Sequence, residues 1–264
     1  GGSGGATGLT GYYQSANGLS GYELKTALHN IIRGHTVRGY GAIWSFYSTS
    51  ERDRYFENDG SLIDVYSEAP STLDPYRYVS TSQQCGNYRS EGDCYNREHA
   101  FPRSWFGGAR EPMNSDIHHV LASDGYVNGR RSSFPYGEVS SASYTSRNGS
   151  RLGVASFNLG YSGTVFEPID EFKGDIARIY FYMATRYENV IAAWSSNSSF
   201  SDAVLDGSRD SVFEPWFLAL LKRWHAEDPV SQKELDRNQA AYDYQNNRNP
   251  YVDHPELVSL IWGP

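Results

Sequence analysis

The sequence predicts an α+β fold that is mostly helical and forms a single domain. Strong helical patterns fill the C-terminal third, whereas residues 50–95 and 134–168 are rich in turn-forming residues, and no internal repeat or long linker is present. With 264 residues, of which 39% are hydrophobic and 20% charged, the chain can bury a sizeable core. We expect the chemistry of the protein to lie in the irregular middle region.

The N-terminal region predicts a leader followed by two helices. The opening Gly/Ser-rich residues 1–8 are expected to be a flexible leader or a cloning remnant, with the single domain over residues 9–264. Residues 20–23 (SGYE) have the pattern of a capping box and precede apolar residues at helical spacing, so we expect a helix over 20–34. A second helix is expected over 39–48.

The middle and C-terminal elements follow from local signals. Residues 58–60 (NDG) predict a tight turn, and residues 63–66 a short strand. Residues 123–133 are expected to form a helix capped by Ser123. The remaining expectations are a surface excursion with short strands over 134–168, helices over 169–190, over 211–226 with Pro215 in an early turn and over 231–245 after a second capping box (SQKE), and a short helix near Pro255.

Charge and hydropathy exclude several classes of protein. The 23 Lys and Arg residues against 31 Asp and Glu give a net charge of −8, which disfavours a protein that simply coats nucleic acid. No run approaches 18 apolar residues, so we expect no transmembrane helix, and no signal peptide opens this sequence.

The two cysteines, Cys85 and Cys94, cannot supply a four-ligand zinc site by themselves. The segment between them is polar and turn-rich, so we predict a disulfide that closes a short loop, the alternative being two buried free thiols. A disulfide implies an oxidising compartment.

Residues 95–108 and 115–131 concentrate the side chains suited to phosphodiester hydrolysis. That reaction needs a group that activates water, a cation that neutralises charge and donors that hold the phosphate. His99 can act as the base because imidazole titrates near neutral pH. Glu98 and Asn128 offer oxygen ligands, which suit Mg²⁺ better than zinc.

The same residues resemble the bacterial endonuclease I family of secreted or periplasmic nucleases with a ββα-metal finger. The resemblance rests on residues 96–106 (NREHAFPRSWF), 115–119 (SDIHH) and 124–132 (DGYVNGRRS). It extends to three further runs, at residues 166–168 (FEP), 173–178 (KGDIAR) and 249–256 (NPYVDHPE), and so covers roughly residues 20–263.

The resemblance implies a finger over about residues 92–133 and a role for each of its key residues. His99 would be the general base, and Glu98 and Asn128 would bind one divalent cation, Mg²⁺ or else Mn²⁺ or Ca²⁺. The implied activity is metal-dependent, non-specific endonucleolytic cleavage of DNA, with RNA as a second substrate, to 5′-phosphate ends. Secretion or a periplasmic location is implied as well, and no obligate protein partner is evident.

The family also uses an arginine between the finger strands to hold the cleaved phosphate. Arg103 and Arg110 are both candidates, and Arg110 is preferred. Arg131, three residues after Asn128, is a better candidate for the site than Arg130. Seven arginines fall between positions 97 and 151, which predicts a local positive cleft despite the acidic total; they are Arg97, Arg103, Arg110, Arg130, Arg131, Arg147 and Arg151.

Neighbouring residues carry weaker expectations. The second finger strand is expected over residues 116–121, where adjacent His118 and His119 would point to opposite faces, so that at least one is structural. Asp116 is expected to be a hydrogen-bond acceptor behind the site rather than a ligand. Trp105 and Phe106, which account for part of the aromatic excess, are expected to pack the loop.

Two other functions compete with the endonuclease hypothesis. An extracellular ribonuclease on the same fold would differ only in how its groove treats the 2′-hydroxyl. A secreted carbohydrate-binding or adhesion module would fit the richness in Tyr, Trp and Gly, but it leaves Glu98, His99 and Asn128 without a role.

Overall fold

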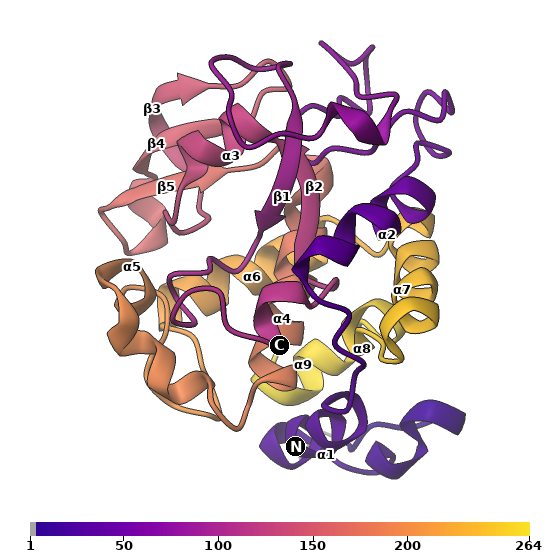
Figure 1. Ribbon diagram of the computed structural model, residues 1–264. Coiled ribbons are helices and arrows are strands. Elements are labelled where there is room, and N and C mark those ends of the chain that lie inside the picture. Colours follow the sequence, from indigo (N-terminus) through magenta and orange to yellow (C-terminus); the bar gives the residue numbers. More distant parts are fainter. Residues whose placement is uncertain (1–3) are drawn as a thin grey trace.

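Helix α4 (Lys173–Arg186) forms the buried centre of the fold in the computed structural model, which describes residues 4–264. All but two of its 14 residues are buried, as expected for a helix surrounded by other elements. It packs against α6 (Pro215–Glu227), α1 (Gly21–Ile32) and α8 (Pro250–Asp253). Figure 1 shows the sheets in the upper half of the view and α1, α4, α8 and α9 below them.

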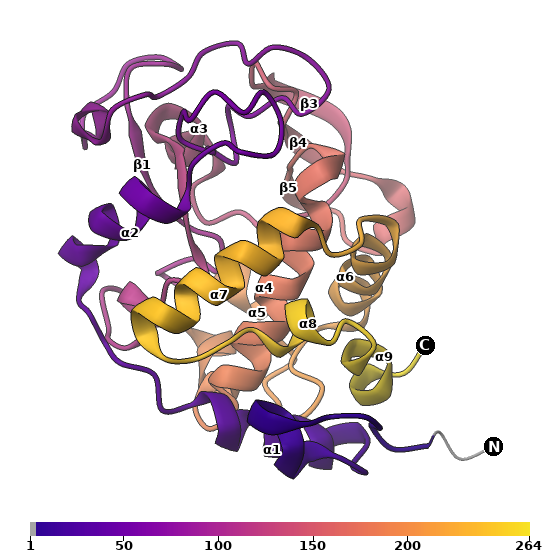
Figure 2. The ribbon, with the colours of Figure 1, turned by 90° about the vertical axis from the view of Figure 1, so that its right-hand side faces the viewer.

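Helix α7 (Gln232–Gln245) crosses α4 in Figure 2, and an ion pair of 2.5 Å between Arg178 and Glu234 joins the two helices. The other α-helices are α2 (Ile43–Ser50), α3 (Gly125–Arg131), α5 (Ser199–Asp202) and α9 (Leu257–Trp262). The short 3₁₀ helices are Gly11–Ala16, Tyr40–Ala42, Thr81–Gln83, Met113–Ser115, Phe157–Leu159, Asp170–Phe172 and Ile191–Asn197.

Two small antiparallel sheets complete the α+β architecture. Strands β1 (Tyr95–His99) and β2 (Val120–Asp124) pair in a register that sets His99 opposite Val120, and α3 begins at the residue that follows β2. The second sheet has the order β3-β4-β5 and is built from Val139–Thr145, Arg151–Ala155 and Thr164–Glu167. The chain therefore runs from strand to strand to helix around residues 95–131.

Most helices that the sequence predicts are present, with shifted ends. The helix predicted over 20–34 is α1, but Ser20 makes no side-chain capping bond, so the capping box expected there is wrong. The capping box at Ser231 is confirmed: its hydroxyl accepts from the backbone of Glu234 and opens α7. Pro215 occupies the first turn of α6, where its missing N–H costs nothing.

Three local predictions in the middle region are wrong. Residues 63–66 form no strand, because the chain curls around Asp64, whose side chain accepts from the backbone N–H of Tyr66. The second strand begins at Val120 rather than Asp116. Helix α3 is capped by Asp124 rather than by Ser123: the Asp124 carboxylate accepts from the backbone N–H of Val127 at 2.8 Å.

The main hydrophobic core is a single cluster that draws residues from both ends of the chain, from Ala6 to Trp262. Ala6 is buried, and its backbone N–H donates to the carbonyl of Leu19 at 2.8 Å. The expectation of a flexible leader over residues 1–8 is therefore wrong for Ala6, whereas residues 1–3 lie outside the described residues. Across residues 4–264, no helix has both the length and the apolar character that crossing a membrane requires.

Candidate active site

An open cleft of about 380 Å³ lies where the end of β1 meets α3. Glu98, His99 and Asn128, which are distant in sequence, all line it. Its other lining residues are Tyr40, Tyr88, Asn96, Arg97, Pro102, Arg103, Ser104, Gly129, Ser132 and Ser133. The strand–strand–helix arrangement thus brings together the three residues that the sequence singles out.

Glu98 is buried, and its two carboxylate oxygens have different surroundings. Oε1 accepts from Arg131 Nη1 at 2.8 Å and from the Tyr66 and Tyr136 hydroxyls at 2.9 and 3.4 Å. Within residues 4–264, Oε2 accepts no hydrogen bond. Burial raises the pKa of Glu98, and the Arg131 charge together with the donated hydrogen bonds opposes that rise. One oxygen is therefore fixed and the other is free to bind a ligand.

The His99 imidazole is held in one orientation by its surroundings. It stacks on the Tyr40 ring at 5.5 Å, and its Nε2 lies 3.0 Å from the carbonyl oxygen of Asn114. Because a carbonyl only accepts, Nε2 carries the proton and Nδ1 keeps its lone pair. Burial, with a smaller effect of the neighbouring His119, lowers the pKa of His99 well below its usual value. The ring is therefore neutral at pH 7 and able to accept a proton.

Asn128 projects from α3 into the same cleft. Its Nδ2 donates to the Arg97 carbonyl and to Ser123 Oγ, both at 3.2 Å, which fixes the orientation of the amide. Its Oδ1 accepts no hydrogen bond from the described residues and is available in the cleft. Helix α3 can lie close to Tyr88 because residue 129 is a glycine. A Cβ at this position would lie 2.7 Å from the Tyr88 hydroxyl.

Arg131 does not face the cleft, contrary to the expectation that it holds substrate phosphate. It is fully buried and pairs with Glu98, and its guanidinium also donates to the carbonyls of His99 and Ala100. Arg131 follows Asn128 by three residues on α3, and its side chain points into the core, where it holds Glu98.

Of the two loop arginines, the structure favours Arg103 and not Arg110. Arg103 lines the cleft together with His99, and its guanidinium lies 5.5 Å from the centre of the Tyr40 ring. Arg110 lines a separate cavity with Arg186. The predicted positive cleft is thus provided by Arg97 and Arg103 rather than by all seven arginines.

The histidines of the 115–119 motif lie outside the cleft. His118 Nε2 contacts the Asn247 carbonyl and His119 Nε2 the Met113 carbonyl, at 3.1 and 2.6 Å. The two residues sit in a turn before β2, so the argument from strand alternation does not apply. His119 does not line the cleft but contacts His99, with the centres of the two rings 5.3 Å apart.

Asp116 is a fully buried acceptor, as the sequence suggests. Its Oδ2 accepts from the Tyr182 and Tyr187 hydroxyls at 2.8 Å, and its Oδ1 accepts from Gln245 Nε2 at 2.8 Å and from the His118 backbone. Burial alone would raise its pKa, but the nearby imidazoles and the Arg186 guanidinium hold the pKa below its usual range. Both of its oxygens are therefore engaged in holding the fold.

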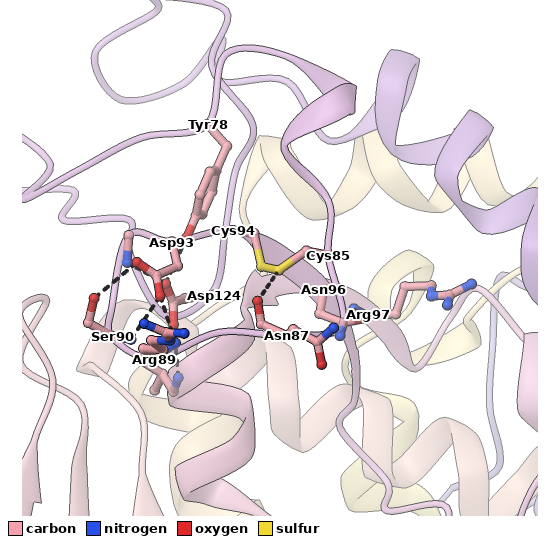
Figure 3. The surroundings of a disulfide bond; sticks show 12 residues. Tyr78, Cys85, Asn87, Arg89, Ser90, Asp93, Cys94, Asn96, Arg97 and Asp124 are labelled. Carbon is pink, nitrogen blue, oxygen red and sulfur yellow. Dashed lines mark hydrogen bonds between the residues drawn. A yellow bond between two sulfur atoms is a disulfide. The ribbon is translucent and has the colours of Figure 1, made fainter.

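The predicted disulfide between Cys85 and Cys94 is present, with the two Cα atoms 5.6 Å apart. Figure 3 shows that the loop it closes lies against Asp124, the residue that caps α3. Asp124 Oδ2 accepts from the Tyr78 hydroxyl at 2.7 Å and from the Gly92 backbone at 2.8 Å. The disulfide loop therefore supports the start of the helix that carries Asn128.

Sequence reasoning did not single out the tyrosines of the site. Tyr66 and Tyr136 fix Glu98, and Tyr40 stacks on His99. Tyr40 begins a three-residue 3₁₀ helix, and the other two lie in separate irregular segments, so no local motif marks them. The only signal was the high tyrosine content, 21 of 264 residues.

A neutral imidazole beside a carboxylate with one free oxygen, in a cleft flanked by arginine, is an arrangement suited to the hydrolysis of phosphate esters. The family model described as Endonuclease I matches residues 20–256. The chain is an endonuclease and belongs to the endonuclease I family.

Curated relatives agree with this assignment. An extracellular ribonuclease of Bacillus amyloliquefaciens is 36% identical over 256 residues, which are 95% of this chain and 78% of the relative. The extracellular ribonuclease of Bacillus subtilis (strain 168) is 33% identical over the same shares. An Endonuclease-1 of Buchnera aphidicola subsp. Acyrthosiphon pisum (strain APS) is 26% identical over 140 residues, 53% of this chain and 45% of that protein.

Proposed function

We propose that the protein is a metal-dependent endonuclease that hydrolyses phosphodiester bonds with His99 as general base. The observation that carries this proposal is the meeting of three groups in one cleft. These are the His99 ring with its Nδ1 lone pair, the free Oε2 of Glu98 and the free Oδ1 of Asn128. Their positions on β1 and α3 support the ββα-metal finger that the sequence resemblance implies.

The donor set fits a hard divalent cation. A carboxylate oxygen and an amide oxygen, each without a hydrogen bond from the described residues, are the ligands that Mg²⁺ or Mn²⁺ takes in proteins, the remaining positions being filled by water. Such a cation, when bound, supplies Lewis-acid stabilisation of the charge that develops on the phosphate.

The residues of the chain supply the rest of the reaction. His99 Nδ1 takes a proton from the water that attacks phosphorus, and its Nε2–H stays on the Asn114 carbonyl, which keeps the ring aligned. Arg103 neutralises phosphate charge at the rim of the cleft. The bond from phosphorus to the 3′-oxygen breaks, and that oxygen takes a proton from a water molecule of the cleft and leaves as a 3′-hydroxyl. The phosphate stays on the other strand end as a 5′-phosphate, and His99 returns its proton to solvent.

The groups placed at the cleft address the phosphate rather than the sugar, so we propose that both DNA and RNA are cleaved. The names of the two Bacillus relatives, which match 95% of this chain, support RNA as a substrate. The same names and the disulfide support action outside the cytoplasm, in an oxidising environment.

The test is cleavage of plasmid DNA and of a structured RNA by the wild type, His99→Ala and a control, His254→Ala, each with Mg²⁺ and with EDTA. His254 lies outside the cleft. We expect His99→Ala to lose about 10²–10⁴-fold in rate on both substrates because the general base is gone, with circular dichroism unchanged. Near-wild-type turnover of His99→Ala, or full activity in EDTA, would show that the proposal is wrong.

A further inference from the structure

A second group of carboxylates lies in the irregular segment between α2 and the disulfide loop. This segment has no helix or strand over residues 51–79, yet much of it is buried. Glu57, Glu68 and Asp74 converge within it: one carboxylate oxygen of each lies within 4.8 Å of the other two. None of the three lines the cleft of Glu98.

No basic side chain neutralises this cluster. Within residues 4–264, no ion pair includes Glu57, Glu68 or Asp74. Like charges at this separation repel, and Asp53, also buried, adds a further negative charge nearby. The arrangement is therefore unfavourable unless a proton or a cation compensates the charge.

Glu68 is the member that most needs a partner. Its exposed fraction is 1%, and neither of its carboxylate oxygens accepts a hydrogen bond from any described residue. Oε2 of Glu57 is buried without a partner as well. Asp74 Oδ1 accepts from the Ala69 backbone N–H at 2.8 Å, and one of the two Asp74 carboxylate oxygens lies in the cluster. Buried carboxylates without donors are costly, so these oxygens point to a missing ligand.

The electrostatic environment agrees with the geometry. Burial, and then the charges of Asp74, Glu57 and Asp53, raise the pKa of Glu68 to about 9. Burial and the surrounding acids raise the pKa of Asp74 to about 6. A bound cation would offset the negative charges that contribute to both shifts.

We propose that Glu57, Glu68 and Asp74 bind a structural Ca²⁺ ion, distinct from the cation of the cleft. The donors are all oxygens, which excludes a soft metal. Three carboxylates on an irregular segment provide the flexible, highly charged shell that Ca²⁺ accepts, whereas Mg²⁺ demands strict octahedral geometry.

This site would act on the cleft through the backbone. Glu68 lies two residues after Tyr66, whose hydroxyl holds Glu98, and the Val65 N–H donates to the carbonyl of Ala122 in β2 at 3.1 Å. The backbone carbonyl of Glu68 is fixed by Asn148 Nδ2 at 3.1 Å. Ca²⁺ would therefore order the segment that positions the metal-ligand carboxylate, without touching substrate.

The test is Ca²⁺ binding by the full chain after removal of metal with EDTA, measured by isothermal titration calorimetry and by thermal unfolding. Glu68→Gln removes a charge from a repulsive cluster, so the variant should fold, and Asp74→Asn provides a second variant. Glu227→Gln, an exposed acid on α6, is the matched control. Asn128→Ala removes the cation ligand of the cleft without touching the cluster.

We expect saturating CaCl₂ to raise the Tm of the wild type by roughly 5 °C, as it should also in Glu227→Gln and Asn128→Ala. In Glu68→Gln and Asp74→Asn, Ca²⁺ affinity should fall by roughly tenfold or more, and the Tm shift should disappear. Absence of Ca²⁺ binding in Asn128→Ala, or an unchanged Tm shift in both cluster variants, would overturn the proposal. Neither result would bear on the nuclease assignment, which has its own test.

Discussion

Glu98, in β1, and Asp116, four residues before β2, are two buried carboxylates that differ in how many of their oxygens accept hydrogen bonds. Glu98 concentrates three donors on Oε1 and leaves Oε2 without a hydrogen bond. Asp116 uses both oxygens, with two tyrosine hydroxyls on one and Gln245 and a backbone N–H on the other. Only Glu98 faces a cleft.

The comparison separates a carboxylate with an available oxygen from one whose oxygens are both engaged in holding the fold. Both lie beside histidines in motifs that look equally suited to chemistry, so residue type and spacing do not distinguish them. The distribution of donors does, because a fully engaged carboxylate has no oxygen left for a cation or substrate. A partly engaged one is oriented and still available.

The largest expected effect is the contrast between Glu98→Gln and Asp116→Asn. Both variants should lose roughly 3 kcal/mol or more of stability, because the buried donors around each carboxylate lose their negatively charged acceptor. Activity per folded molecule should fall by roughly 100-fold or more in Glu98→Gln, where a metal ligand is lost. It should remain near the wild-type value in Asp116→Asn. Unfolding curves paired with nuclease rates below the transition check this, and equal activity losses would erase the distinction between the two carboxylates.

The next effect concerns Asn128, whose amide oxygen is a neutral and weak ligand. Asn128→Ala should lower activity roughly 10–100-fold at low Mg²⁺ and recover part of it at high Mg²⁺. Activity measured across a Mg²⁺ titration, with the exposed Asn189→Ala as control, is the required experiment. A loss that no Mg²⁺ concentration relieves would instead assign Asn128 to holding His99 or the substrate.

His118, a buried neighbour of Asp116, predicts a pH effect on stability. Burial lowers the pKa of His118 to about 4, while the unfolded chain keeps its ordinary value near 6.5. Between these values the unfolded state binds more protons, so His118 costs stability as the pH falls from 6.5 towards 4. The destabilisation caused by His118→Gln should therefore be smaller at pH 5 than at pH 7, by about 2 kcal/mol. Denaturant unfolding at both pH values tests this, and a pH-independent difference would contradict it.

The smallest effect distinguishes Arg103 from Arg110. Arg103→Ala should lower kcat/KM by roughly tenfold, because one charge-assisted phosphate contact is lost, and the deficit should shrink at high salt. Arg110→Ala should change kcat/KM less, since Arg110 lines another cavity. A larger loss of kcat/KM in Arg110→Ala than in Arg103→Ala would show that Arg110 makes the phosphate contact instead.

The sequence predicts the helices well and singles out three residues that line one cleft, for identifiable reasons. Helix α7 carries both a capping box and a clear end, and the motifs around Glu98, His99 and Asn128 are specific. The start of β2 and the cap of α3 were misplaced by a few residues. The competing acceptors Asp116 and Asp124 each organise a turn that the pattern of apolar residues does not show.

The partners of the site residues were beyond the reach of the sequence. Arg131 was expected on a phosphate, but tertiary packing turns it inward to Glu98. Tyr40 comes from a three-residue 3₁₀ helix, and Tyr66 and Tyr136 come from irregular segments; in such short or irregular pieces no periodicity predicts which way a side chain points. Such contacts depend on long-range packing, which local patterns do not encode.

We expect Glu98 and Asn128 to bind the catalytic cation together, beside His99. Anomalous scattering from a Mn²⁺-soaked crystal tests it most directly. We predict a peak within about 2.0–2.4 Å of Glu98 Oε2 and Asn128 Oδ1. A peak at Asp116, His118 and His119 instead, with none in the cleft, would contradict this account.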